Sequence, residues 1–305
     1  MDSRGDALVA LGRSLQQQGY VFVTPTPETH RRVNQRAEAS EGGLARDIRD
    51  AFGWSRPFRA DLLPVSMLTL LESAGELEQT DGLYRSRVRF SSLRGLLLVH
   101  SAFPTAAANA VFFGPDTYRY CTLLEHWAPR ARRVVDIGCG SGAGGLFLAS
   151  KAEEVLLADI NPAALVFSQV NAALAGVTVR VVESDVLASV EGPLDLVIAN
   201  PPYMRDPAAR LYRDGGGAHG EGLSVRIVRE ALARLSHGGK LIVYTGSAVV
   251  AGRDSFHDAV TPILKDAGVA FSYEELDPDV FGEELSEPGY EQVERIAAVG
   301  LKVVR

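Results

Sequence analysis

The sequence predicts an α/β protein in which a smaller, mainly helical first part precedes a larger part built on a parallel sheet. Three observations predict this fold class. Early in the chain, several stretches have apolar residues at helical spacing. After about residue 105, apolar strands alternate with glycine or acidic turns and helices. The chain has 305 residues, enough for two domains at roughly 150 residues each. We therefore expect one domain over residues 1–104 and a second over residues 105–305.

The first part is expected to consist of helices followed by a hairpin. Apolar periodicity and helix stop signals place the helices over residues 5–18, 28–39, 43–53 and 62–74. The dipeptide Asp81-Gly82 precedes the run 83–90, and such a dipeptide between strands is typical of a tight hairpin turn. A second apolar run follows at 96–99. Helices followed by a hairpin favour a winged-helix-like unit.

The second part repeats the order strand, turn, helix. Apolar strands are expected at residues 133–137, 155–159, 177–182, 194–199 and 240–245. The helix after the second strand is the best marked, because Asn161 can cap it, Pro162 suits its first turn and Gly176 can end it. The remaining elements are a helix and two strands that can pair antiparallel, near residues 255–267, 269–276 and 295–304. Such alternation predicts a mixed sheet with helices on both faces.

Charge and composition narrow the class of protein. The formal net charge is −7, with +1 on residues 1–115 and −8 on residues 116–305, which argues against broad phosphate binding by the second part. The apolar runs are far shorter than the roughly 20 residues of a membrane helix, and the N-terminus lacks a signal-peptide pattern. Because of these short runs, we expect no contact with a membrane. Because Cys121 and Cys139 are the only cysteines, we expect a reduced, cytoplasmic protein.

A glycine-rich loop follows the first strand of the second part. Residues 134–142 read VVDIGCGSG, which puts glycines at three alternating positions, Gly138, Gly140 and Gly142. Glycine lets the backbone approach a ligand closely, and a loop of this kind at the carboxyl edge of a parallel sheet marks the ligand crevice of an open α/β fold. The sequence therefore predicts a ligand at this loop.

Two kinds of ligand fit the loop. Gly140, Gly142 and Gly145 also match the dinucleotide pattern GxGxxG, with Asp159 placed 19 residues after the first of them. Asp136 distinguishes the two interpretations, because a carboxylate ahead of the glycines repels a pyrophosphate and attracts a cation. It favours a positively charged nucleoside such as S-adenosylmethionine.

Acidic residues also follow the next two strands. Asp159 ends the second strand, where a carboxylate can accept hydrogen bonds from the two hydroxyls of a ribose. Asp185 follows the third strand, within reach of an adenine amino group. Each acid alone is more simply interpreted as a solvated loop or cap residue. Because Asp136, Asp159 and Asp185 stand on three successive strand ends, together they favour a nucleoside site.

The fourth strand ends in the tetrad Asn200-Pro201-Pro202-Tyr203. The prolines hold the preceding residues in extended geometry, so the Asn200 side-chain oxygen and the Pro201 carbonyl oxygen are rigidly placed. Both can accept hydrogen bonds from one NH₂ group while Tyr203 stacks on the planar group that bears it. During methyl transfer to that nitrogen, positive charge grows there and the two oxygens stabilise it. Standing alone, the tetrad would indicate only a proline strand end.

Together these motifs resemble a known family. The run DIGCGSG at 136–142, Asp159, Asp185 and the tetrad at 200–203 resemble the class I S-adenosylmethionine-dependent methyltransferases. The tetrad is similar to that of the branch acting on planar nitrogens, which includes release-factor glutamine methyltransferases and adenine or guanine amino methyltransferases. The resemblance covers roughly residues 107–305. It implies a seven-stranded Rossmann-like methyltransferase domain with S-adenosylmethionine as cofactor.

The resemblance also implies which residues form the site. Residues 113–117 are similar to the family's segment that borders the cofactor, and residues 214–225 to the glycine-rich segment after the tetrad. The acceptor is expected to contact Asn200, Pro201, Pro202 and Tyr203. The cofactor is expected to contact Thr117, Asp136, Gly138, Gly140, Gly142, Asp159, Ile160, Asp185, Val186 and Asn200. No metal is expected, because His219 and Glu221 match the HxE of zinc deaminases but no PCxxC follows.

Several acceptors remain open. By resemblance the first is a glutamine side chain in a protein, followed by an exocyclic amine of RNA or DNA and by a small molecule. Arg85, Arg87 and Arg89 alternate along the expected strand 83–90, so their side chains are expected on one face. There they can contact the phosphates of RNA or DNA, unless they pair with acidic residues across the hairpin. The alternative from a different class is a non-catalytic regulator, whose first domain binds nucleic acid and whose second domain only senses the cofactor.

Overall fold

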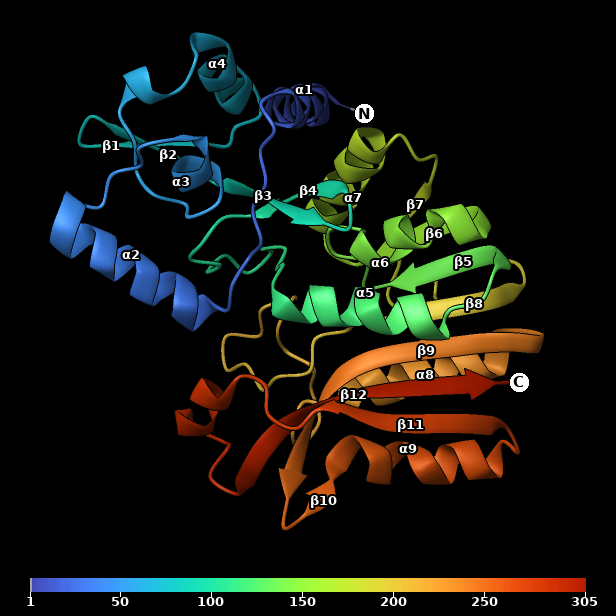
Figure 1. Cartoon of the computed structure of the whole chain (residues 1–305). Helices are drawn as coiled ribbons and strands as arrows, with labels where there is room; N and C mark the ends of the chain where they lie inside the picture. Colours follow the sequence, from blue (N-terminus) through green and yellow to red (C-terminus); the bar gives the residue numbers. More distant parts are fainter. Residues whose placement is uncertain (1) are drawn as a thin grey trace.

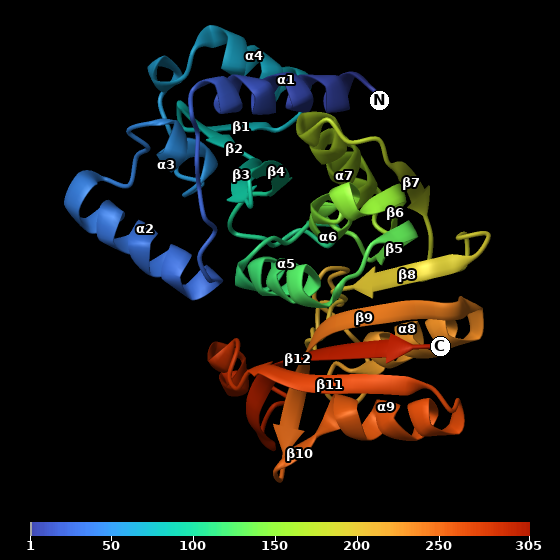
Figure 2. The ribbon, with the colours of Figure 1, turned by 45° about the vertical axis from the view of Figure 1, so that its right-hand side comes forward.

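The computed structural model describes residues 2–305, apart from the side chain of Glu41. A mainly helical N-terminal part lies beside a larger part that holds the central sheet (Figure 1, Figure 2). The helices of the N-terminal part are α1 (Ser3–Gln17), α2 (Pro27–Glu41), α3 (Ile48–Phe52), the 3-10 helix η1 (Ala60–Leu62) and α4 (Val65–Ser73). Its strands form two separate antiparallel pairs, β1 (Leu77–Thr80) with β2 (Leu83–Ser86) and β3 (Val88–Leu93) with β4 (Leu96–Ser101).

The central sheet has seven strands in the order β11-β12-β9-β8-β5-β6-β7, and the two-residue strand β10 extends it beside β9. The strands are β5 (Ala131–Ile137), β6 (Ala152–Asp159), β7 (Arg180–Glu183), β8 (Leu194–Ala199), β9 (Leu235–Val250), β10 (Arg253–Asp254), β11 (Ala270–Asp277) and β12 (Val293–Val304). The strands from β9 to β7 pair in parallel, whereas β12 pairs antiparallel with β9 and β11. The predicted α/β class and the antiparallel last pair are therefore confirmed.

Helices cover both faces of this sheet. They are α5 (Pro115–Trp127), α6 (Ala143–Phe147), α7 (Pro162–Ala175), α8 (Gly222–Arg234) and α9 (Ser255–Asp266), with the 3-10 helices η2 (Ala149–Lys151) and η3 (Gly282–Ser286). Adjacent residues of β5 show the two layers, because Val134 joins the hydrophobic cluster that contains α5 and Val135 joins the one that contains α8 and α9. Within residues 2–305, no helix combines the length and apolarity that a membrane span requires.

Helix α7 begins and ends where the sequence predicts, and it joins the two parts. The Asn161 side chain caps its first turn, and Gly176 ends it with a φ of 67°. One side of α7 packs against α1 and β4 (Figure 2). The hydrophobic cluster at this contact draws on both parts, and its buried members include Leu8, Leu11, Leu15, Phe90, Phe167 and Val170. The two parts therefore share a hydrophobic core at α7.

The third expected helix is shorter than predicted. Residues 43–47 are not helical, because Asp47 caps α3 by accepting a hydrogen bond from the N–H of Asp50 at 2.8 Å. The Asp50 side chain then accepts from the N–H of Arg46 and from the guanidinium of Arg56, which holds the preceding segment as a loop.

The prediction of a continuous strand over 83–90 is wrong. The chain bends at Arg87, whose N–H donates to the carbonyl of Glu76 and whose carbonyl accepts from the N–H of Ala102. These bonds end β2 and start β3 on either side of Arg87. As a result, Arg87 is exposed whereas Arg89 is buried, and the expected row of arginines on one face does not form.

Candidate active site

The carboxyl ends of β5, β6 and β8 open onto a cavity of about 480 Å³, a volume typical of small-molecule sites. Its other walls come from α2, from α5 and the loop before it, from residues 210–213 and from η3. The residues expected from the sequence that line it are Thr117, Asp136, Gly138, Gly140, Asp159, Ile160, Asp185, Val186, Asn200, Pro201, Pro202 and Tyr203. Gly142 instead caps α6 with a φ of 77°, and its backbone lies against Leu157 and Ser168.

Asp136 lies at the end of β5, buried beneath the glycine loop. One carboxylate oxygen accepts a hydrogen bond from the N–H of Gly145 at 2.8 Å, and the other accepts from the Tyr120 hydroxyl at 3.3 Å. Burial raises the pKa of this carboxyl to about 7, against the lowering effect of those two hydrogen bonds. A cationic group in the cavity would favour the ionised carboxylate.

Asp159 and Asp185 differ in how they are held. Asp159 is buried, and its oxygens accept hydrogen bonds from the N–H groups of Gly140 and Asn161 at 2.9 and 2.8 Å. Burial raises the pKa of this carboxyl as well. Asp185 is exposed, and Arg226 of α8 donates two hydrogen bonds to it at 2.8 and 2.9 Å. Each carboxylate has more than two lone pairs, so both can still accept from a ligand.

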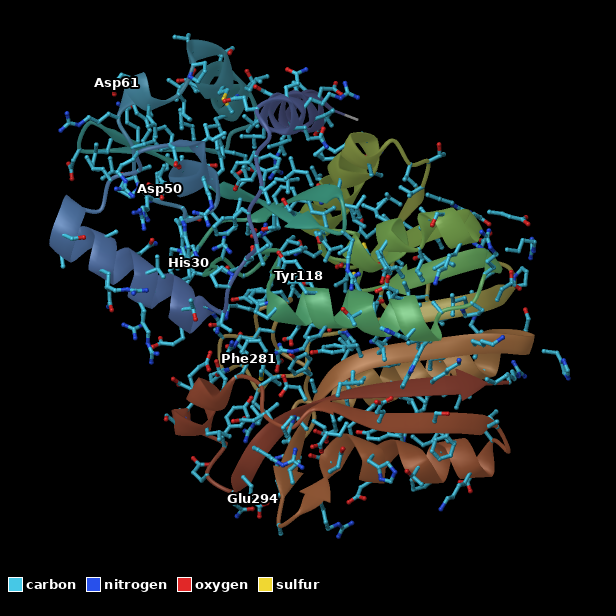
Figure 3. The ribbon with its side chains drawn as sticks, in the orientation of Figure 1. His30, Asp50, Asp61, Tyr118, Phe281 and Glu294 are labelled. Atoms are coloured by element: carbon cyan, nitrogen blue, oxygen red, sulfur yellow. The ribbon has the colours of Figure 1, made fainter. Side chains whose placement is uncertain are left out.

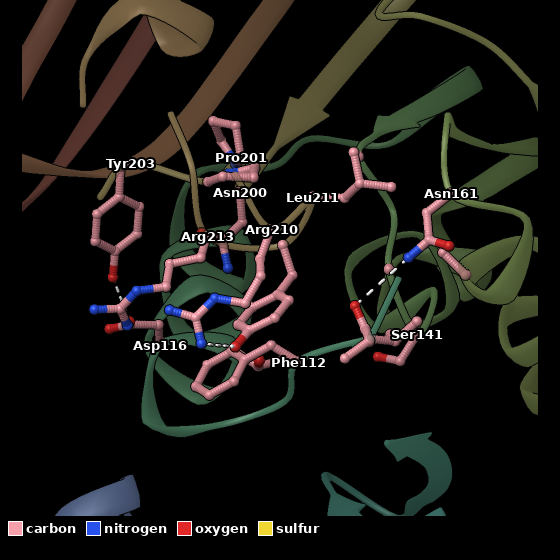
Figure 4. A pocket seen from close by; sticks show the side chains of 18 of the residues that line it. Phe112, Asp116, Ser141, Asn161, Asn200, Pro201, Tyr203, Arg210, Leu211 and Arg213 are labelled. Atoms are coloured by element: carbon pink, nitrogen blue, oxygen red, sulfur yellow. Dashed lines mark hydrogen bonds between the residues drawn. The ribbon is translucent and has the colours of Figure 1, made fainter. Parts of the chain in front are cut away.

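Asn200 and Pro201 continue directly from β8 into the cavity wall. The Asn200 side chain points into the cavity (Figure 4). Within residues 2–305, neither the Asn200 side chain nor the Pro201 carbonyl oxygen takes part in a hydrogen bond. Two acceptor oxygens on a proline-stiffened segment are therefore available to a ligand that carries N–H groups.

Tyr203 is buried at the cavity wall, and its hydroxyl donates to Asp116. The Tyr244 hydroxyl donates to the same carboxylate at 2.7 Å, and Arg119 donates at 3.2 Å. Burial raises the pKa of Asp116 despite these contacts. Gly246 makes room for the tyrosine ring, since a Cβ there would lie 2.3 Å from Tyr203. These contacts fix the Tyr203 ring in one position.

Sequence reasoning missed Asp116 and Tyr244. Asp116 lies within the segment 113–117, which was predicted to border the cofactor. Its role as a buried acceptor for the Tyr203 and Tyr244 hydroxyls was not predicted. Tyr244 lies within the apolar strand predicted over residues 240–245, where nothing distinguishes it from a core residue. The contribution of α2 to the cavity, through Pro27, Glu28 and Arg31, was also missed.

Replacing Asp116 by Ala is expected to lower the free energy of unfolding by about 2–4 kcal/mol, because the hydroxyls of Tyr203 and Tyr244 would be buried without their acceptor. Urea unfolding measures the change. Glu78→Ala removes an exposed carboxylate near Arg87 and is the matched control, expected to stay within about 0.5 kcal/mol of the original protein. Equal stability of the two variants would contradict the bonding role of Asp116.

Three arginines line the cavity, and each is paired with a carboxylate. The pairs are Arg31 with Glu28, Arg210 with Asp206 and Arg213 with Glu284. Arg210 and Arg213 lie on either side of the Asn200 side chain in Figure 4. The charge of every described arginine at this cavity is therefore compensated inside the protein.

Comparisons with known proteins find similar methyltransferases. Residues 121–251 match the family model described as Methyltransferase small domain. The release factor glutamine methyltransferase of Deinococcus radiodurans is 37% identical over 156 residues, covering 46% of this chain and 55% of that protein. The ribosomal RNA small subunit methyltransferase C of Chromohalobacter salexigens is 30% identical over 190 residues, covering 62% of this chain and 47% of that protein. The chain thus spans about half the length of these curated relatives.

The fold has a counterpart among solved structures, and the cavity fits a cationic nucleoside. The crystal structure of Trm5b from Pyrococcus abyssi aligns with a TM-score of 0.50 at 16% identity, over 78% of this chain and 68% of that one. The buried Asp136 carboxylate suits a sulfonium, and the Asp159 carboxylate suits ribose hydroxyls. Residues 121–251 are therefore similar to a methyltransferase small domain, and the acidic strand ends at the cavity suit S-adenosylmethionine as the cofactor.

Proposed function

We propose that this protein transfers a methyl group to a planar nitrogen, and that its acceptor is the side-chain amide of a glutamine in a protein. The observation that carries the proposal is the pair of acceptor oxygens on Asn200 and Pro201, which have no hydrogen-bond partner within residues 2–305 and border the cavity. When bound, S-adenosylmethionine supplies an electrophilic methyl group on its sulfonium.

The acceptor oxygens overcome the low reactivity of an amide nitrogen. Its lone pair is delocalised into the carbonyl group, so the nitrogen is a poor nucleophile. The Asn200 Oδ1 and the Pro201 carbonyl oxygen accept the two N–H groups and orient the lone pair. As the C–N bond forms and the S–C bond breaks, positive charge develops on the nitrogen, and the same oxygens stabilise it more than they stabilise the neutral amide. The methylated nitrogen then loses one N–H proton to solvent and becomes neutral. Tyr203, fixed by Asp116, supports the planar amide from one side.

The donor is proposed to bind between the glycine loop and the three acidic strand ends. Asp136 faces the positive charge, Asp159 accepts from the ribose hydroxyls, and Asp185 accepts from the adenine amino group. The neighbouring contacts are proposed for Thr117, Gly138, Gly140, Ile160 and Val186, with Asn200 at the junction of donor and acceptor.

The charges at the cavity favour a protein acceptor over a nucleic acid. Phosphate backbones are bound by uncompensated Lys and Arg side chains. Here the arginines are already paired, and Glu283 adds an exposed carboxylate. An exocyclic amine of RNA is the second candidate, because the relative named for ribosomal RNA is 30% identical to this chain.

The N-terminal part is proposed to recognise the acceptor. Residues 1–104 would form this accessory domain and residues 105–305 the catalytic domain. The position of α2 supports this assignment, because Pro27, Glu28 and Arg31 line the same cavity as the catalytic tetrad. The acceptor would then contact both parts of the chain.

Labelled S-adenosylmethionine and a bacterial lysate distinguish the acceptors. The protein, donor and lysate are incubated together, and portions are treated with protease or with nuclease. We expect the label to remain macromolecular after nuclease and to become small after protease, with methylated glutamine in the hydrolysate. Incubation with Asn200→Ala controls for methyltransferases of the lysate. Label released by nuclease would identify the acceptor as a nucleic-acid amine and contradict the glutamine proposal. Label in neither macromolecular fraction would identify the acceptor as a small metabolite.

A further inference from the structure

Arg89 is a buried guanidinium that has no carboxylate partner within residues 2–305. It lies on β3 and is 4% exposed, and its Nε makes no hydrogen bond. Its Nη2 donates to Nδ1 of His30 at 3.3 Å. Burial lowers the pKa of Arg89 to about 10, so the side chain still carries its charge at neutral pH. This positive charge is therefore not neutralised by the protein.

The polar groups around Arg89 are themselves uncharged. His30 Nε2 lies 2.7 Å from the Trp54 carbonyl oxygen and must donate to it, so Nδ1 is the acceptor for Arg89. Burial, together with the charge of Arg89, lowers the pKa of His30 to about 3. Burial also raises the pKa values of the Tyr20 and Tyr118 hydroxyls, which leaves them protonated. Figure 3 marks His30 on α2 and Tyr118 on α5.

A lone buried charge of this kind is costly for the fold. Desolvating an ion costs several kcal/mol unless a partner of opposite charge compensates it. Replacing such a charge by an apolar side chain of similar volume is often neutral or stabilising. Groups that reduce stability in this way are characteristic of binding and catalytic sites. The cost therefore indicates that a ligand supplies the missing negative charge.

Arg89 lines a small cavity that lies against the main one. It has a volume of about 10 Å³, which is room for a single water-sized group. Both cavities are lined by the same four residues, Pro27, Phe103, Thr105 and Phe112. The two cavities therefore adjoin, and a ligand in the main cavity would reach Arg89 by passing between these shared side chains. One oxygen of a planar carboxylate fits this space, and a carboxylate is a good partner for a guanidinium.

We propose that Arg89 binds a carboxylate of the methyl acceptor while the target nitrogen lies at Asn200. This inference rests on the proposed function and adds that the acceptor carries a negative charge near its glutamine. An acidic side chain and a free carboxyl end of a peptide share this chemistry. Arg89 would recognise the acceptor and hold it in register with the tetrad.

NMR spectroscopy of the full chain labelled with ¹⁵N-arginine tests the proposal. The Nε–Hε signal of Arg89 is identified by its absence from Arg89→Met, and that of the exposed Arg87 by its absence from Arg87→Met. Sodium acetate is titrated at constant ionic strength, with acetamide as the neutral analogue. We expect acetate to shift the Arg89 signal saturably, acetamide to leave it in place, and Arg87 to show no saturable change. An Arg89 signal that ignores acetate, or responds equally to acetamide, overturns the proposal.

Arg89→Lys provides a second variant that keeps the charge. Lysine is a more strongly hydrated point charge on a flexible stem, so it binds one carboxylate oxygen less well. We therefore expect acetate to raise the melting temperature of Arg89→Lys only at concentrations at least about tenfold higher than for the original protein. Equal acetate responses of the two proteins would contradict recognition by the guanidinium. If Arg89→Met does not fold, the Nε–Hε signal of Arg89 is identified by its absence from Arg89→Lys instead. The acetate titration of the original protein then shows whether Arg89 binds a carboxylate.

Three small glutamine compounds distinguish the two sources of the carboxylate. N-acetylglutamine carries a free carboxyl end, a capped glutamine-glutamate dipeptide carries an acidic side chain, and a capped glutamine-glutamine dipeptide carries neither. We expect only the first two to shift the Arg89 signal, and the stronger of them identifies the source. A shift with the neutral dipeptide alone overturns the proposal. Because the readout is binding at Arg89, its failure leaves the result for Asn200→Ala unaffected.

Discussion

Replacing Asn200 by Ala is expected to reduce kcat by about 10²–10³-fold, the loss typical when one fixed hydrogen-bonding group of a transition state is removed. The Asn200 oxygen would hold the acceptor N–H, and alanine leaves only the Pro201 carbonyl oxygen for this task. Binding of S-adenosylmethionine should be largely retained, because the acidic strand ends and the glycine loop are unchanged. Initial rates of methylation, with the lysate fraction that contains the acceptor as substrate, measure the loss of kcat. Calorimetric titration with S-adenosylmethionine measures donor binding.

Asn109→Ala is the matched control for this experiment. Asn109 is exposed, and the hydrogen bond it makes to Asn161 uses its backbone carbonyl, which alanine keeps. This control should therefore retain both activity and donor binding. Unchanged turnover of Asn200→Ala would exclude the proposed role of the tetrad. A loss of donor binding equal to the loss of turnover would show that Asn200 acts on the donor rather than on the acceptor.

Local signals in the sequence predicted most of the fold. The cap and stop of α7 at Asn161 and Gly176 are properties of single residues, so they could be located without knowledge of the surroundings. The hairpin at Asp81-Gly82 is equally local, because both residues adopt positive φ, 52° and 78°. The strands of the sheet were recognised since apolar runs bounded by glycine or acidic turns rarely occur elsewhere in such regular succession.

Elements that depend on distant partners could not be predicted in the same way. The bend at Arg87 is set by backbone hydrogen bonds to Glu76 and Ala102, and no residue type near Arg87 predicts it. Alternation along the expected strand therefore assigned the wrong face to the arginines. The burial of Arg89, which carries the further inference, follows from that bend and from the packing of α2.

The residues of the candidate site also differ in how far the sequence could predict their positions. Asp136, Asp159 and the tetrad lie at strand ends, and the carboxyl ends of parallel strands share one edge, so their proximity was predictable. The contact of Tyr203 and Tyr244 with Asp116 joins residues up to 128 positions apart. Only the three-dimensional structure reveals this contact. It suggests that Tyr203 is held rigidly before any acceptor binds.

Affinity for S-adenosylmethionine is expected to depend on pH through Asp136. Burial raises the pKa of this carboxyl in the free protein to about 7. The sulfonium is a cation and favours the ionised form, so below pH 7 each bound donor must displace a proton. The dissociation constant should therefore increase by about tenfold for each unit of pH below 7 and level off above it. Calorimetric titrations from about pH 6 to about pH 8 measure this dependence.

Asp136→Asn should weaken donor binding and remove the inflection near pH 7. Losing a charged partner costs about 1.5–3 kcal/mol, which corresponds to about 10–100-fold in affinity. Asp159 also has a raised pKa and would account for any weaker dependence that remains at lower pH. Asp258→Asn alters an exposed carboxylate beside Arg253 and should reproduce the original curve. An inflection near pH 7 that persists in Asp136→Asn would assign the titration to another group.

The ionisation of Asp136 also affects stability, which a second measurement can follow. Because folding raises the pKa of Asp136, the donor-free protein is favoured while this carboxyl is protonated and loses that contribution as the pH rises through 7. The bound donor stabilises the ionised carboxylate and offsets this loss. S-adenosylmethionine at a fixed concentration should therefore raise the melting temperature more at pH 8 than at pH 6. In Asp136→Asn the two increments should converge, and a difference that persists there would mean that the donor does not bind against Asp136.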